Sequence, residues 1–191
     1  MTILRSTGAR LLAAAILTLL WATKSNGALL VLDRAESHVD IAVKSTFSNF
    51  VCRVEAFDLA VALDPASGKV ESTTFHANLA SVKTGREDRD HNMNVWLQTD
   101  KFPQVVFVLG AIDRGPDRTW IARGTIQLHG QKRNMTFPVT VTVSQGTSTI
   151  DGTVTLDTRD FGLPIVRFLI LTVEPAVHVH FHLQGTTSTT L

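Results

Sequence analysis

The chain has 191 residues with 18 basic and 17 acidic side chains, and its formal net charge is +1. This balance argues against nucleic acid as a partner, because a nucleic-acid interface needs an excess of positive charge. The single cysteine, Cys52, excludes an internal disulfide, so burial of apolar side chains must hold the fold together. We expect Cys52 to be a small buried residue within a strand rather than a reactive thiol.

Residues 1–27 have the composition of an export signal. Two arginines precede a short apolar run at 11–21, and Ser25-Asn26-Gly27 offers small residues where a signal peptidase cuts. We expect cleavage at the end of this segment, with an uncleaved membrane anchor as the alternative. Cleavage leaves residues 28–191 as one domain of formal charge −2, because 18 minus the three basic residues of the signal gives 15 against 17 acidic ones.

The remainder of the chain alternates apolar and polar residues with a period of two, which predicts strands with one buried face. Turn residues such as Gln145-Gly146 separate successive runs and predict hairpins, hence an antiparallel meander. We expect eight or nine strands near residues 29–33, 38–46, 51–63, 69–80, 104–112, 118–128, 134–145, 148–157 and 169–184.

One charged segment interrupts the strand pattern. Met93, Trp96 and Leu97 have helical spacing, and Thr84 and Glu87 have the spacing of a capping box. The sequence therefore predicts one short amphipathic helix between strands, leading directly into the strand that begins near residue 104.

An antiparallel sheet of this length stacks as a sandwich or closes as a barrel, and we expect an all-β barrel of about eight strands because the edges carry little Pro or Lys protection. Its expected interior is apolar and suits an aliphatic or isoprenoid tail. The same residues equally describe a filled core, so periodicity leaves both readings open. The candidate lining residues are Phe47, Phe57, Phe107, Trp120, Phe137, Val139, Val141, Leu156 and Phe181.

Two charged groups are candidates for binding a ligand headgroup at the barrel mouth. The first consists of Arg89, Asp90 and His91 with Trp96 in the predicted helix, and the second of Arg159 and Asp160 in a later turn. Arginine suits phosphate or carboxylate because its planar fork offers several donors. The alternative is structural, in which these charges start the helix, pair with one another or lie in a solvated loop.

The last predicted strand carries His178, His180 and His182 on one face, where neighbouring imidazoles could share a metal ion. Because the intervening residues are apolar and claim the inside, we expect the histidines to face water and expect no metal or other cofactor. The chain has no nucleophile elbow, P-loop, HExxH motif or paired cysteines, so we expect no enzymatic activity.

Several stretches together resemble the YceI-like family of exported lipid-binding proteins. They are residues 33–50, 81–107, 128–141 and 158–164, and their most specific parts are Arg89-Asp90-x-x-Met93 with Lys101-Phe102-Pro103, Leu128-His129-Gly130 and Arg159-Asp160-Phe161-Gly162. The resemblance covers nearly all of residues 28–191. Cys52 departs from it, standing where the family often has glycine, as do the three histidines of the last strand.

The resemblance implies a lipocalin-like antiparallel barrel that binds a long amphiphilic lipid in its lumen, works in the bacterial periplasm and is not an enzyme. A polyisoprenoid, an isoprenoid quinone and a fatty-acid derivative all remain open as the ligand. We expect a monomer or weak dimer with no stable membrane insertion after signal cleavage. The alternatives are a structural or stress-related module with a filled core, and a protein that binds metal through the histidines.

Overall fold

The computed structural model describes residues 28–63, 70–117 and 119–189, so the expected export signal lies outside the described residues. Its helices are α1 (Glu87–Leu97) and the 3₁₀ helices η1 (Leu79–Ser81) and η2 (Thr158–Phe161). Its strands are β1 (Ala28–Leu32), β2 (His38–Val43), β3 (Phe50–Val54), β4 (Phe57–Leu63), β5 (Val70–Asn78), β6 (Val82–Lys83), β7 (Gln104–Arg114), β8 (Thr119–Leu128), β9 (Gln131–Ser144), β10 (Thr147–Asp157), β11 (Arg167–Phe168), β12 (Leu171–Thr172) and β13 (Ala176–Thr189). None of the described helices is both long enough and apolar enough to span a bilayer.

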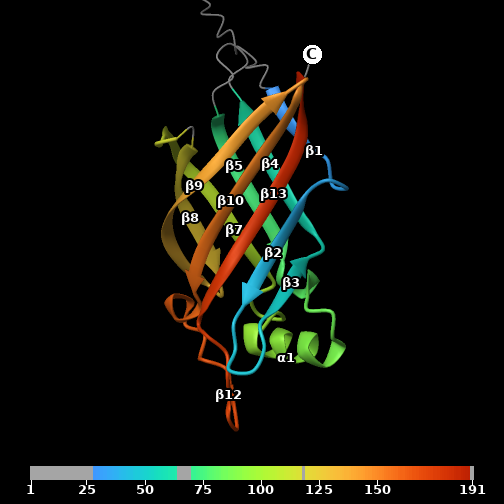
Figure 1. The fold of residues 1–191 in the computed structure, drawn as a ribbon, viewed down its shortest axis with the longest axis vertical. Helices are drawn as coiled ribbons and strands as arrows, with labels where there is room; N and C mark the ends of the chain where they lie inside the picture. The colour runs from blue at the N-terminus through green and yellow to red at the C-terminus, as the bar shows by residue number, and fades with distance from the viewer. Residues whose placement is uncertain (1–27, 64–69, 118, 190–191) are drawn as a thin grey trace, which may run out of the picture.

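The strands form the expected closed antiparallel barrel (Figure 1). The order around the wall is β1-β4-β5-β7-β8-β9-β10-β13, and β13 then pairs with β1 to close the ring. Strand β13 is long enough to pair twice, with β1 near its C-terminal end and with β2 near its start. Strands β3 and β6 continue the sheet from β2.

Two of the predicted strands are each divided in the structure. The expected strand 51–63 is two strands, β3 and β4, and the buried positions shift from even numbers at Cys52 and Val54 to odd numbers at Phe57 and Val61. The expected strand 169–184 is replaced by the small hairpin β11–β12 and by β13, with Pro175 between them. Proline has no N–H for a sheet ladder, so it stands before the strand rather than within it.

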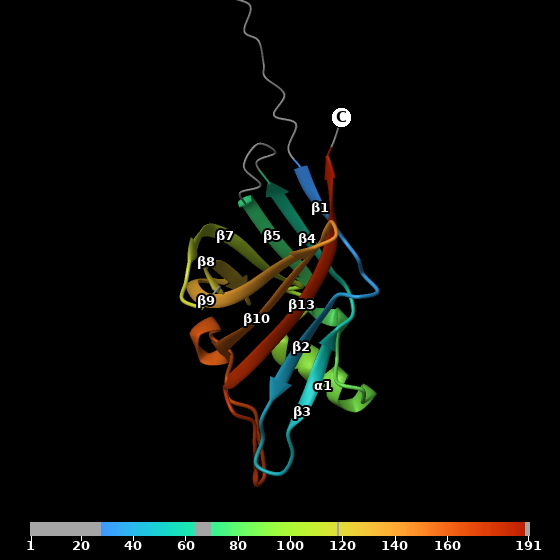
Figure 2. The same ribbon diagram turned by 45° about the horizontal axis from the view of Figure 1, so that its top comes forward.

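The two ends of the barrel differ. Helix α1, helix η2 and the hairpin β11–β12 lie at one end, which we call the helix end (Figures 1 and 2). The turns β7–β8 and β9–β10 and the last residues of β13 lie at the other, which we call the opposite end. The helix end is filled by a cluster of buried side chains, namely Leu79, Leu97, Ile126, Leu128, Leu156, Phe161 and Leu163.

A second cluster surrounds Cys52, which is 2% exposed on the inner face of β3. Burial disfavours the charged thiolate and raises the pKa of Cys52 to about 11. Cys52 is therefore the small buried strand residue that the sequence predicted.

Candidate functional site

The inner wall of the barrel is apolar and carries a series of phenylalanine rings. Phe107 and Phe137 have ring centroids 5.4 Å apart, and Phe137 meets Phe181 edge-on at 6.1 Å. On the neighbouring strands β4 and β5, Phe57 lies 5.7 Å from Phe75, which pairs across the sheet with Phe107. Such contacts are favourable beyond the area they bury, so these rings hold one another in place.

Two wall glycines explain how the rings fit. A Cβ atom on Gly152 of β10 would stand 2.9 Å from Phe181 Cε1, and one on Gly124 of β8 would stand 2.5 Å from Phe107 Cζ. Carbon atoms normally approach only to about 3.5 Å. Each ring therefore lies against the wall in the space that the missing Cβ leaves, rather than crossing the barrel interior.

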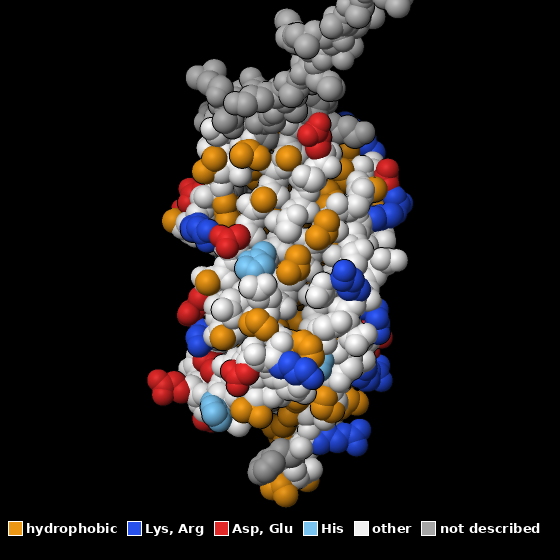
Figure 3. All heavy atoms as spheres, turned by 180° about the vertical axis from the view of Figure 1, so that it is seen from behind, with side chains coloured by type: hydrophobic (Ala, Val, Ile, Leu, Met, Phe, Trp, Pro, Cys, Tyr) orange, Lys and Arg blue, Asp and Glu red, His pale blue; other side chains and the backbone are white. Residues whose placement is uncertain are grey.

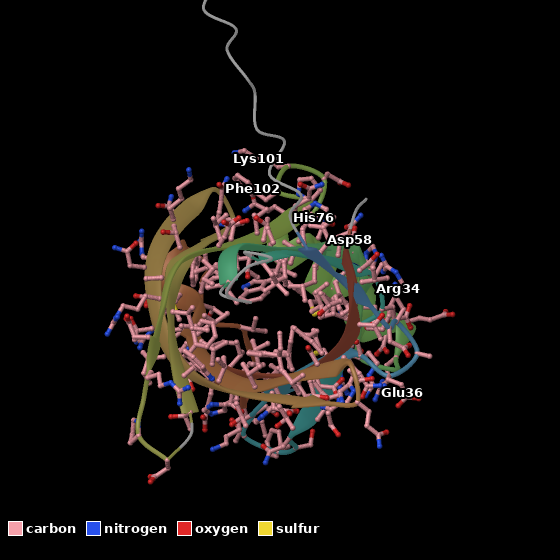
Figure 4. The ribbon with its side chains drawn as sticks, turned by 90° about the horizontal axis from the view of Figure 1, so that it is seen from above. Arg34, Glu36, Asp58, His76, Lys101 and Phe102 are labelled. Carbon is pink, nitrogen blue, oxygen red and sulfur yellow. The ribbon has the colours of Figure 1, made fainter. Side chains whose placement is uncertain are left out.

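Side chains in the middle of the barrel point inward but are not fully buried. Phe107, Phe137, Val154, Val179 and Phe181 all lie on the inner face, and each is partly exposed to solvent. Viewed from the opposite end, side chains of the surrounding strands point toward the barrel axis (Figure 4). The middle of the lumen is therefore less tightly packed than the helix end.

Charged side chains gather on the outer wall. Arg34 donates to Asp58 and to the Phe57 carbonyl, and His76 Nδ1 lies 3.9 Å from Asp58 (Figure 4). The contrast between a charged outer face and an apolar inner face is what a container for an apolar molecule requires.

The opposite end is where the inner wall meets solvent. Val143 occupies an inner-face position of β9, opposite Ser148, yet its side chain is 69% exposed. Also on the inner face, Arg114 pairs across β7 and β8 with Trp120, and its guanidinium carbon lies 4.9 Å from the indole ring centroid. No carboxylate among the described residues forms an ion pair with Arg114. Among the described residues, the inner face at this end carries Val143 and Trp120 together with the cation Arg114.

The predicted lining residues are mostly, but not all, on the inner wall. Phe57, Phe107, Phe137, Val139, Val141, Leu156 and Phe181 face inward, with Leu156 inside the packed helix-end cluster. Trp120 faces inward at the rim rather than deep in the lumen. Phe47 does not line the barrel, because it lies in the loop between β2 and β3 with 62% of its surface exposed.

The charged residues of α1 hold the helix in place. Asp90 accepts hydrogen bonds from the backbone N–H of Thr84 at 2.8 Å and from its hydroxyl at 2.6 Å, and the hydroxyl bond lowers the pKa of Asp90. The expected capping box is absent, since Arg86 is the N-cap residue and makes no side-chain cap bond. His91 is exposed on the outer side of the helix.

Arg89 and Trp96 attach α1 to the barrel. The Arg89 guanidinium carbon lies 4.2 Å above the Phe50 ring, and Arg89 forms no ion pair with Asp90 in the described structure. Trp96 Nε1 donates a 2.8 Å hydrogen bond to the Pro164 carbonyl. Because these two residues are seven apart, they lie on one face of α1 and attach that face to the barrel.

Arg159 and Asp160 lie in η2 at the helix end and are exposed. The Arg159 fork is occupied, because Nη2 lies 2.6 Å from Asp157 Oδ2 and Nε lies 2.9 Å from Asp157 Oδ1. These bonds lower the pKa of Asp157. The pair fixes the turn that leads from β10 towards the hairpin β11–β12.

His178, His180 and His182 lie on the outer face of β13, as predicted. Their Nδ1 atoms lie 2.9 Å from Thr155 Oγ1, 3.0 Å from Thr153 Oγ1 and 2.6 Å from Asp151 Oδ1, respectively. His38 stacks on His182 at 5.3 Å, and His180 and His182 line an outer groove of about 630 Å³. Within the described residues no three His, Cys, Asp or Glu side chains are arranged to hold a metal ion.

Arg114 and His129 are not among the predicted site residues. The predicted strand ends at residue 112, whereas β7 continues to Arg114 and places this residue on the inner face. His129 closes the helix end, with its ring 4.3 Å from Phe102 and its Nδ1 3.0 Å from the Phe161 carbonyl oxygen. The Leu128-His129-Gly130 motif was the signal for this position.

Comparison with known proteins gives a family and a fold. The sequence pattern of the YceI-like domain matches residues 30–185. The crystal structure of Burkholderia cenocepacia BcnA superimposes with a TM-score of 0.73 at 24% identity, covering 82% of this chain and 100% of BcnA. A polyisoprenoid-binding domain from Saccharophagus degradans, implicated in plant cell wall breakdown, gives 0.61 at 16% identity, with 84% and 98% covered.

A Campylobacter jejuni YceI protein superimposes with a TM-score of 0.63 at 14% identity, covering 74% of this chain and 86% of that one. At these identities the likeness is one of fold. No curated protein sequence matches the chain significantly.

Proposed function

We propose that this chain, which belongs to the YceI-like family, is a carrier that holds one long amphiphilic lipid with its tail in the barrel lumen. The observation that carries the proposal is the arrangement of the inner wall, where Phe107 and Phe181 lie over Gly124 and Gly152 and the inward side chains at mid-height are partly exposed to solvent. The polyisoprenoid-binding domain of Saccharophagus degradans has a similar fold and supports a lipid as the class of ligand.

The driving force in this proposal is removal of the tail from water. Each CH₂ group transferred from water to an apolar wall gains about 0.8 kcal/mol, so a tail of a dozen carbons supplies ample gross energy before ordering costs are subtracted. The wall needs no specific polar partner for the tail. Selectivity for the lipid class must then come from the rim.

We place the headgroup at the opposite end, beside Arg114 and Trp120. The helix end is filled by buried side chains, whereas inner-face Val143 at the opposite end is open to solvent. The guanidinium carbon of Arg114 lies 4.9 Å from the Trp120 ring centroid, and no described carboxylate pairs with Arg114, so its donors are available to a phosphate or carboxylate. The placement favours an anionic amphiphile, such as a polyprenyl phosphate, over a neutral one.

Binding without catalysis is the second part of the proposal. The described inner wall presents rings, aliphatic side chains and a few hydroxyls such as Ser148, and no described pair of acid and base converges on the lumen. The buried Cys52, whose pKa is raised to about 11, is a poor nucleophile at neutral pH. Export of residues 28–191 to the periplasm would give the carrier an aqueous gap to bridge.

The test is a titration of lipid-free protein with polyprenyl phosphate and with the corresponding polyprenol, followed by tryptophan fluorescence. Trp96→Phe leaves Trp120 as the only tryptophan of residues 28–191, and Trp120→Phe leaves Trp96. We expect saturable binding with a spectral shift in the Trp96→Phe protein and a much smaller shift in the Trp120→Phe protein. Absence of saturable binding by either lipid would refute the proposal, and a shift confined to Trp96 would move the headgroup to the helix end.

A further inference from the structure

The hairpin β11–β12 ends in an exposed apolar turn. The hairpin projects beyond the helix end of the barrel (Figures 1 and 2), and hydrophobic side chains form that extremity (Figure 3). Phe168 pairs with Leu171, so Leu169 and Ile170 make a two-residue turn. Their side chains are 90% and 77% exposed.

A second exposed apolar residue, Phe47, lies beside this hairpin. Thr46 donates its backbone N–H to the Thr172 carbonyl at 3.0 Å, and Thr172 N–H returns a 3.1 Å bond to the Thr46 hydroxyl. These bonds hold the β2–β3 loop, with exposed Phe47, against the base of the hairpin. We call Phe47, Leu169 and Ile170 the apolar tip.

The backbone of the tip is poorly suited to its residues. Leu169 has φ +53°, a left-handed conformation in which a β-hairpin normally places Gly, Asn or Asp. The other four described non-glycine residues with positive φ are all polar, namely Gln98, Asp117, His129 and Gln145. A leucine that is 90% exposed and in a left-handed conformation adds nothing to the packing of the barrel, and such a residue points to a contact outside the chain.

The charges around the tip favour a membrane as its partner. Residues 44–49 and 167–174 contain three charged side chains, all of them exposed. Lys44 and Arg167 are positive, and Glu174, whose backbone N–H donates to the Lys44 carbonyl, is negative. A projecting apolar apex with cations and hydroxyls behind it fits into a lipid surface, where the apex enters the acyl boundary and the cations meet anionic headgroups. Two cations alone hold a protein weakly, but apolar insertion adds the second contribution that stable attachment needs.

We propose that the apolar tip inserts into the headgroup region of an anionic membrane and docks the barrel there by its helix end. The proposal goes beyond lipid carriage and does not depend on an occupied lumen.

The test compares vesicle binding by the full chain and two double variants, with the N-terminus of each preparation checked by mass spectrometry. Leu169→Gly with Ile170→Ser removes the apex and relieves the left-handed strain, so this protein should fold at least as stably as the parent. Leu29→Ser with Val31→Ser is the matched control, because it removes two exposed apolar side chains from β1 near the opposite end. Flotation uses vesicles of phosphatidylglycerol and phosphatidylethanolamine, and separately of phosphatidylcholine.

We expect the parent chain to bind the anionic vesicles more strongly than phosphatidylcholine vesicles. The tip variant should partition into the anionic vesicles on the order of 100-fold more weakly than the parent, and the control variant should match the parent. Lys44→Glu with Arg167→Glu should abolish the preference for anionic vesicles. Affinity of the tip variant for detergent-dispersed polyprenyl phosphate should equal that of the parent, which separates loss of docking from loss of the lumen. Equal vesicle binding by the tip and control variants would overturn the proposal. It would also be overturned if the tip variant differed from the parent only in self-association, measured by sedimentation, because the tip would then be an interface between copies of the chain.

Discussion

Substitution of Gly152 by alanine tests whether the Phe181 ring borders a usable lumen. The new Cβ would stand 2.9 Å from Phe181 Cε1, so the ring must leave the wall. The atoms it meets belong to the end of one side chain, and rotation into the lumen is the available response. We therefore expect a modest loss of stability, about 1–2 kcal/mol, together with an obstructed interior.

The size of the binding defect follows from the tail that the ring displaces. If the displaced ring excludes at least about three methylene groups from the wall, affinity falls by about 2.4 kcal/mol, or roughly 50-fold. Replacing Phe181 by leucine in the same chain shortens the obstructing side chain and should restore most of the affinity. Isothermal titration of lipid-free Gly152→Ala and Gly152→Ala/Phe181→Leu with polyprenyl phosphate measures both effects.

Gly124→Ala supplies the contrasting variant. Its Cβ would meet the backbone carbonyl of Val108 as well as the Phe107 ring, and backbone cannot rotate away. This substitution should lower the melting temperature more than Gly152→Ala does. The reasoning fails if Gly152→Ala binds lipid as tightly as the parent, because the Phe181 ring would then be remote from the tail.

The remaining predictions concern charges and the thiol. Arg114→Gln should weaken binding of polyprenyl phosphate roughly tenfold and leave the affinity for polyprenol unchanged. Arg89→Gln should change the affinity for both lipids equally. The opposite pattern in the titrations would place the headgroup at the helix end. Thr84→Val should cost about 1 kcal/mol at pH 7, because it removes the hydroxyl bond to charged Asp90. Since the pKa of folded Asp90 lies below its ordinary 3.8, that contribution is present above this value and is lost as pH falls through the folded pKa, so parent and variant should converge in acid denaturation curves. Cys52 should resist Ellman's reagent at pH 8 until the protein is denatured, and rapid labelling of the native protein would contradict its burial.

The fold was accessible from the sequence because period-two alternation survives in nearly every strand of the wall. The errors came where alternation continues across a bend. Cys52, Val54, Phe57 and Val61 read as one long apolar run, but the change from even to odd buried positions marks the corner between β3 and β4. Pro175 marks the second missed break, since a strand interior rarely contains proline.

The candidate site could be predicted only in part, for a different reason. Phe47 is apolar and lies near a strand, but whether a loop residue faces the lumen depends on tertiary hydrogen bonds such as those between Thr46 and Thr172. Arg114 was misplaced by an error of two residues in a strand end, which decides whether a side chain reaches the inner face. An open or filled interior depends on where Gly124 and Gly152 stand relative to the rings on neighbouring strands, which only the register fixes.

Native mass spectrometry of the protein purified from its own host tests the central claim most directly. We expect the intact chain to carry one additional mass in the range of a long-chain lipid, at one molecule per barrel, and the Gly152→Ala chain to carry much less of it. Detection of the bare polypeptide mass alone, both as purified and after incubation with polyprenyl phosphate, would contradict the proposal that the lumen is a lipid site.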